Sequence, residues 1–549
     1  MVAAAGRSAR RVRPDTYLFF FTVFALIVFA THLPHLDLPF YWDEAGHFIP
    51  AARDLYLAGQ WVPHSATPNV HPPGVMLYLA GAWRLFGYSI PATRAAMLLL
   101  TAAAILMVFL LAIQLCRGLK GVPAMWAALL VLLSPLVYTQ GMLAQLDLPA
   151  MLLTAWALLC FLQQRCLAAA LISIALVLVK ETGVVTPAVF AVWLWREGRR
   201  HEALYFLLPV AALTGWLAAL TAATGHPLGH REFADFNILY PLHPVRAAAA
   251  LLRRAYYLLV ANFHWAGWLA VWWAARRHGI YANRGWRVAV TLGLAQVLAV
   301  TLFGGAVLER YLLPVLPLVY IAMAAAWTTT SGWRMRLSQG VVMAGLPVCL
   351  FVNPPYPFPY ENNLAMVDFV RLHQSVAELL ERDYPRSTVT TAWPLSTALR
   401  RPEYGYVQRR QAVRELPDFA VSRLRALDPA QVEVFVLYSR EWEPAFSLWG
   451  YSFFRSLRER YWGWEPQMSP EELESRFGLT EVARWERRGQ WIAVFAGSAA
   501  TPATLRAARG APKLAPTARL PAENVRATAA GSPTAPQTAG GAPPRRQSA

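Results

Sequence analysis

Apolar residues gather in long runs along this chain, and short polar or basic segments separate the runs. Several runs approach the roughly 20 residues that a helix needs to cross a bilayer. The pattern predicts a polytopic α-helical membrane protein with about 11 transmembrane helices. We expect the first helix at about 16–32, the third at about 122–138 and the last at about 340–353.

One apolar stretch, residues 167–195, can be interpreted in two ways. A single long helix would carry the basic segment REGRR to the outer side, although Lys and Arg favour cytoplasmic connections. Gly183 and Pro187 also interrupt the run, and proline breaks the hydrogen bonding of a helix interior. We therefore expect two half-length helices flanking the segment KETG.

Composition favours a membrane protein over a nucleic-acid-binding protein. The 549 residues are 56% hydrophobic and 15% charged, whereas soluble domains are about 25% charged. The formal charge of +18 comes from basic residues spread between the apolar runs, not gathered on one soluble face. The basic segment RSARRVR places the N-terminus in the cytoplasm. An odd number of crossings then carries the chain from about residue 356 to the extracytoplasmic side of the plasma (inner) membrane.

The sequence divides into four parts. A basic cytoplasmic N-terminus (1–15) precedes a transmembrane catalytic domain (16–355) that carries a long outer loop (33–91). Residues 356–500 predict a small extracytoplasmic α/β domain, because a helix-like segment precedes the strand-like segments STVTTAW, VEVFVLY, LTEVARW and QWIAVFAG. The Ala/Pro-rich tail (501–549) lacks the large apolar residues of a core and is expected to be disordered.

Two adjacent acids, Asp43 and Glu44, lie in the outer loop. DEAGHFIPAARDLYLAG and PPGVMLYLAGAWRLFG have helical apolar spacing and end at Gly59 and Gly87, so both predict amphipathic helices on the outer membrane face. Acids at a helix start can simply favour the helix dipole. The alternative is a general base at the lipid–water boundary.

Further ionisable residues lie on the same expected side. Asp147 opens a helix, where N-capping is the simple explanation. Lys180 follows an apolar run too short to reach the outer surface, and a cation within the bilayer by default marks a function. Pairing with Glu181 or snorkelling would explain it otherwise. The other candidates have anchoring or loop structure as their simple explanation: His71, Arg94, Glu309, Arg310 and Tyr311.

The ordered segments YWDE, HPPGVMLYLAGAWRLFG, AQLDLP, VKETG and ERYLLPVLP resemble the GT-C superfamily of membrane glycosyltransferases. The resemblance covers about residues 15–330, and the protein O-mannosyltransferase and aminoarabinose-to-lipid-A transferase group is the most similar branch. It implies a polyprenyl-phosphate sugar as donor and a reaction on the extracytoplasmic face.

The resemblance also implies roles for single residues. Asp43 matches the acid that takes the acceptor's proton, with Glu44 beside it, and Asp147 matches the acid of the second outer loop. Lys180 matches the lysine near the lipid phosphate, and Arg310 the basic residue before the Tyr-Leu-Leu-Pro run. Other substrate contacts are expected at Arg94, Glu309, Tyr311 and His71, although the aminoarabinose transferases have lysine at the place of this histidine.

We therefore expect an inverting glycosyltransferase that acts on an acceptor hydroxyl or phosphate of a protein or glycolipid. A polyprenyl-lipid flippase or secondary transporter, which cleaves no bond, is the main alternative, and a non-catalytic assembly protein is the second. No Asp-x-Asp spacing occurs in the first outer loop, and no cofactor, metal or nucleic acid is expected. Which sugar and which acceptor are used stays open.

Overall fold

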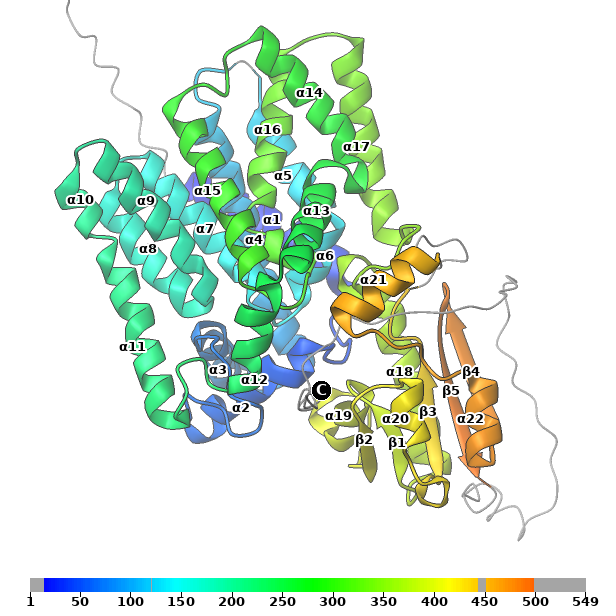
Figure 1. The fold of residues 1–549 in the computed structure, drawn as a ribbon. Coiled ribbons are helices and arrows are strands. Elements are labelled where there is room, and N and C mark those ends of the chain that lie inside the picture. Colours follow the sequence, from blue (N-terminus) through cyan, green and yellow to red (C-terminus); the bar gives the residue numbers. More distant parts are fainter. Residues whose placement is uncertain (1–13, 120, 443–450, 498–549) are drawn as a thin grey trace, which may run out of the picture.

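The computed structural model describes residues 14–119, 121–442 and 451–497. It consists of a helical bundle and, below it in Figure 1, a C-terminal part built around a sheet. The expected Ala/Pro-rich tail and nearly all of the expected basic N-terminus lie outside these ranges.

Within these described ranges, four helical segments are long and apolar enough to cross a membrane. They are α1 (Pro14–His32) with the short turn that follows it, α4 (Ile90–Leu115), α10 (Arg200–Leu204) with α11 (Leu207–Thr224), and α15 (Arg284–Leu302). The chain is thus a helical membrane protein, while the count of about 11 crossings stays a prediction.

The helix expected at about 122–138 is in fact two helices. Between α5 (Pro123–Leu133) and α6 (Pro135–Met142) the chain bends by 66°. Ser134 is extended at the bend, because a residue before proline is pushed out of the helical conformation. If the bent pair is one crossing, the number of candidate spans rises to five.

Shorter helices complete the bundle. The expected break within 167–195 is confirmed: α8 (Cys166–Val179) and α9 (Val185–Arg196) flank a single turn at Glu181–Val184. After α11 the chain forms α12 (Arg231–Ala234) and α13 (Pro244–Leu259). The remaining bundle helices are α7 (Asp147–Leu162), α14 (His264–Arg277), α16 (Leu316–Thr329) and α17 (Trp333–Phe351).

The first outer loop folds as the sequence predicts, into two helices. A five-residue π-helical turn, Glu44–Phe48, leads into α2 (Ile49–Ala58), and α3 (Gly74–Phe86) follows. Gly59 ends α2 at a φ of 67°, a left-handed conformation that glycine adopts without steric cost. Figure 1 shows α2 and α3 side by side at the lower end of the bundle.

The C-terminal part has a five-stranded mixed sheet in the order β2-β1-β3-β5-β4. The helix expected before it is α18 (Ala365–Asp383), and the four expected strands are β1 (Val389–Ala392), β3 (Val434–Tyr438), β4 (Leu479–Arg487) and β5 (Gln490–Gly497). The fifth strand, β2 (Val413–Leu416), is short, partly exposed and parallel to β1, and was not predicted from the sequence. The small helices here are α19 (Leu395–Arg400), α20 (Val421–Arg425), α21 (Ser452–Trp462) and α22 (Pro470–Phe477).

This C-terminal part packs directly on the first outer loop. Arg53 of α2 forms an ion pair with Glu403, and the Tyr406 hydroxyl donates to the Phe40 carbonyl at 3.1 Å. The Trp42 and Trp393 rings lie 4.8 Å apart, edge to face. The outer loop is therefore held between the bundle and the sheet.

Candidate active site

Glu44 belongs to a closed, buried ion pair. Its side chain has no solvent exposure and pairs with Arg94, which is equally buried. The carboxylate also accepts the backbone N–H groups of Tyr41 at 2.9 Å and Ala144 at 2.5 Å. With both oxygens occupied and the side chain fully buried, the geometry favours a structural role for Glu44 over the assistance to a base expected from the sequence.

Arg94 likewise faces protein only. Besides Glu44, its guanidinium donates to the carbonyl oxygens of Met142 at 2.9 Å, Leu38 at 3.0 Å and Pro39 at 3.1 Å. It connects the start of the outer loop to α4 and to the end of α6. The geometry favours a structural role for Arg94 over the substrate contact expected from sequence.

Asp43 points elsewhere and pairs with Arg310. It lies at the start of the π-helical turn but makes no capping hydrogen bond with its side chain. Short π-helical turns often occur at functional sites. Burial opposes ionisation of Asp43, but the Arg310 guanidinium prevails and lowers the pKa of this carboxyl below its ordinary value. Asp43 is therefore an anion at neutral pH.

Arg310 is shared by three carboxylates. Its nitrogens contact Asp43, Asp147 at 3.2 Å and Glu361 at 2.9 Å, and one also donates to the Gln145 side chain at 2.7 Å. The exposed fractions of the three carboxylate side chains are 21%, 5% and 4%, in the same order. Asp43 is thus the most accessible of the three carboxylates.

Lys180 joins the same cluster through Asp147. The ammonium group pairs with Asp147 and lies 4.3 Å from the centre of the Tyr311 ring. The N-cap position of α7 is Leu146, and Asp147 is the first residue of the helix, with its side chain paired to Lys180 and Arg310, so N-capping does not explain this acid. Glu181 does not pair with Lys180 either: its Oε2 lies 2.9 Å from His71 Nδ1.

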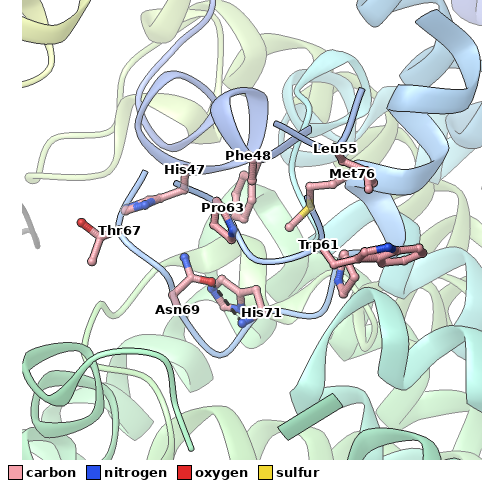
Figure 2. A pocket seen from close by; sticks show the side chains of 11 residues that line it. His47, Phe48, Leu55, Trp61, Pro63, Thr67, Asn69, His71 and Met76 are labelled. Carbon is pink, nitrogen blue, oxygen red and sulfur yellow. Dashed lines mark hydrogen bonds between the residues drawn. The ribbon is translucent and has the colours of Figure 1, made fainter. Parts of the chain in front are cut away.

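His71 lines a small pocket beside the cluster. Figure 2 shows the His71 ring beside Asn69 at the edge of this pocket, with His47 at the left of the view and Trp61 at the right. The Asn69 side chain accepts the His71 backbone N–H at 3.1 Å. Burial lowers the pKa of His47, and its Nδ1 is buried without a hydrogen-bond partner among the described residues. The pocket therefore brings the His47 ring, four residues along the chain from Asp43, close to the cluster.

A second guanidinium near the cluster has no hydrogen-bond partner in the described part of the chain. Arg254 of α13 is 1% exposed, and all three of its side-chain nitrogens are unpaired there. Its nearest charged or titratable neighbours are Tyr311, Glu309 and Arg253, and Glu309 already accepts from Arg253 at 2.6 Å. Burial lowers the pKa of Arg254 to about 10, so the group stays cationic at neutral pH.

Glu361 is the functional candidate that sequence reasoning missed. It lies in a short turn, Tyr360–Asn362, between α17 and α18. Burial raises the pKa of Glu361 to about 7, although Arg310 opposes the shift. Its signal in the sequence was weak: a single acid among aromatic residues and prolines after the last apolar run.

The structure thus sorts the expected site residues into three places. Connected side chains form what we term the Arg310 cluster: Asp43, Asp147, Lys180, Arg310 and Tyr311 from the prediction, with Gln145 and Glu361 added. His71 and Glu309 lie beside this cluster, and Glu44 with Arg94 forms a separate buried pair. Within the described ranges, no group of three or more His, Cys, Asp or Glu side chains could hold a metal ion.

Comparison with solved structures identifies the fold. ArnT from Cupriavidus metallidurans bound to undecaprenyl phosphate superposes with a TM-score of 0.51 at 16% sequence identity, covering 89% of this chain and 100% of ArnT. The apo state of ArnT gives 0.50 at 15% identity, over 87% and 98% of the two chains. This chain has the GT-C fold. The resemblance expected from the sequence is confirmed at the level of the fold.

The remaining comparisons show a weaker structural similarity or no match. The archaeal oligosaccharyltransferase AglB from Archaeoglobus fulgidus gives a TM-score of 0.45 at 11% identity, over 77% of this chain and 69% of AglB. No protein-family model matches the sequence. No curated protein matches it either.

Proposed function

We propose that this protein is an inverting glycosyltransferase of the plasma (inner) membrane. It moves a sugar from a polyprenyl-phosphate donor to a hydroxyl or phosphate of a protein or glycolipid on the extracytoplasmic face. The observation that carries the proposal is the Arg310 cluster, which joins an accessible carboxylate to buried cations. A GT-C fold shared with ArnT, which was solved with undecaprenyl phosphate, supports the same conclusion.

Asp43 is the base in this mechanism. It is ionised and is the most exposed carboxylate bonded to Arg310. It takes the proton of the acceptor group as the acceptor oxygen attacks the anomeric carbon. The new bond forms on the face opposite the phosphate, which inverts the configuration.

The leaving group is the polyprenyl phosphate, which keeps the electron pair of the broken carbon–oxygen bond. Its added negative charge needs cations in a site of low dielectric, where charge-assisted hydrogen bonds act strongly. Lys180 and Arg310 supply two of them. Arg254 supplies a third, because a buried guanidinium without a partner is costly and an incoming phosphate would satisfy it. Asp147 fixes Lys180 and Arg310 relative to each other.

Purified protein reconstituted with a labelled undecaprenyl-phosphate sugar and a membrane extract as acceptor source tests the proposal. We expect release of undecaprenyl phosphate with the wild type and none with Asp43→Asn. Asp37→Asn is the matched control, since Asp37 is an exposed acid of the same loop outside the cluster. Movement of the intact donor across the bilayer without bond cleavage would show a flippase or transporter instead. Transfer at a near-normal rate by Asp43→Asn would exclude this base.

A further inference from the structure

Glu361 connects the C-terminal part to the cluster. Its carboxylate lies 2.9 Å from one terminal nitrogen of Arg310, while the other terminal nitrogen pairs with Asp43. The Thr139 hydroxyl of α6 donates to the Glu361 backbone carbonyl, which fixes this turn on the bundle. The Gln145 amide lies 3.4 Å from the same carboxylate oxygen. Glu361 is thus held from three sides without reaching the accessible face of the site.

The charges of the cluster do not balance when Glu361 is ionised. Three carboxylates, Asp43, Asp147 and Glu361, then face two cations, Arg310 and Lys180. The other titratable groups near these carboxylates are His47 and His71, beside Asp43, and the tyrosines Tyr41, Tyr311 and Tyr360. Burial keeps Tyr41 neutral by raising its pKa. A proton on Glu361 or on Asp43 brings the net charge of the five groups to zero.

That balance matters at the moment of reaction. When Asp43 accepts the proton of the acceptor, its charge disappears and so does its attraction for Arg310. Arg310 then keeps its contacts to Asp147, Gln145 and Glu361. Of these, Glu361 is the anion on the second terminal nitrogen, so it limits rotation of the guanidinium and costs no reorganisation, because it is already in place.

We propose that Glu361 is a positioning residue that keeps Arg310 in place while Asp43 becomes protonated. Glu361 touches neither donor nor acceptor and acts through Arg310 alone. This role rests on the proposed function. It also gives the C-terminal part a function at the site, since the chain runs directly from Glu361 into α18 and the sheet.

A pH profile of transfer distinguishes this role from a merely structural one. In the wild type, kcat should rise through an inflection near pH 7 as Glu361 ionises. Glu361→Gln should lose the inflection and lower kcat on the order of 10²-fold, the cost of about 1 Å of misplacement. KM for the donor should hardly change. Glu361→Asp keeps the charge on a shorter arm, so part of kcat and the inflection should return.

The matched control is Glu403→Gln, which removes an acid of the C-terminal part that pairs with Arg53 of the outer loop, away from the cluster. It should leave the pH profile unchanged. If Glu361→Gln does not fold, Glu361→Asp decides alone: a wild-type kcat there overturns the inference, as does a wild-type profile of Glu361→Gln. A wild-type protein that releases no undecaprenyl phosphate overturns the proposed function itself, which is a different outcome.

Discussion

Replacing Glu44 with glutamine removes the negative charge opposite Arg94 and keeps nearly the same side-chain shape. Both members of this pair have 0% side-chain exposure, so the guanidinium cannot recover its hydration. Removing one partner of a buried ion pair costs about 3–5 kcal/mol. We expect Glu44→Gln to lower the free energy of unfolding by about that amount.

The neighbouring acid should behave in the opposite way. Asp43 is 21% exposed, and Arg310 keeps two other carboxylates when Asp43 is neutralised. Asp43→Asn should therefore cost only about 1 kcal/mol of stability, as partly exposed ion pairs do, while transfer is abolished. Two adjacent carboxylates thus give one unstable variant and one inactive variant.

Reversible unfolding in mixed detergent micelles, followed by tryptophan fluorescence, measures the free energies, and release of undecaprenyl phosphate measures activity. The double variant Glu44→Leu with Arg94→Met should not recover the lost stability, because it leaves the backbone N–H groups and carbonyls that this pair satisfies buried without partners. A Glu44→Gln variant of wild-type stability that cannot transfer sugar would refute this reasoning and make Glu44 catalytic.

Four further changes test other parts of the molecule. Lys180→Met should lower the rate of transfer roughly 10²–10³-fold in the undecaprenyl phosphate release assay, as loss of one stabilising donor does. Arg254→Met should weaken undecaprenyl phosphate binding about 10-fold or more in a titration, yet leave the unfolding free energy unchanged or higher, because an unpaired buried charge is removed. Gly74→Ala should cost about 1–3 kcal/mol in unfolding measurements, because its Cβ would lie 2.5 Å from a backbone carbonyl of α8, whereas Gly81→Ala on the same helix meets nothing within 4 Å. The pKa of Glu361 is about 7, against an ordinary 4.5, so the folded state holds this proton more tightly than the unfolded state. The free energy of unfolding should therefore fall as the pH rises from 4.5 to 7. In Glu361→Gln this fall should be absent.

Local pattern was enough to predict much of the fold. Apolar runs and their interruptions gave the helices of the bundle, including the break beside Gly183, because a helix depends on neighbours three and four positions away. Gly59 ended a helix where the spacing indicated. The hairpin of β4 and β5 was visible for the same reason, since its strands pair across a tight turn. The bend at Ser134 was missed, although the proline after it was a local signal.

The sequence by itself determined which residue types the site holds, and only the tertiary structure decided which of them meet. Buried ionisable groups are costly, so their presence in an apolar chain indicated a site. Which charged residues pair depends on how distant segments fold together: Arg310 pairs with Asp43 although the two lie 267 positions apart in the sequence. The adjacent Asp43 and Glu44 looked equivalent in the sequence, but the turn at residue 42 sends one carboxylate into the cluster and the other to Arg94. Glu361 carried no local pattern, because its importance comes entirely from lying beside Arg310.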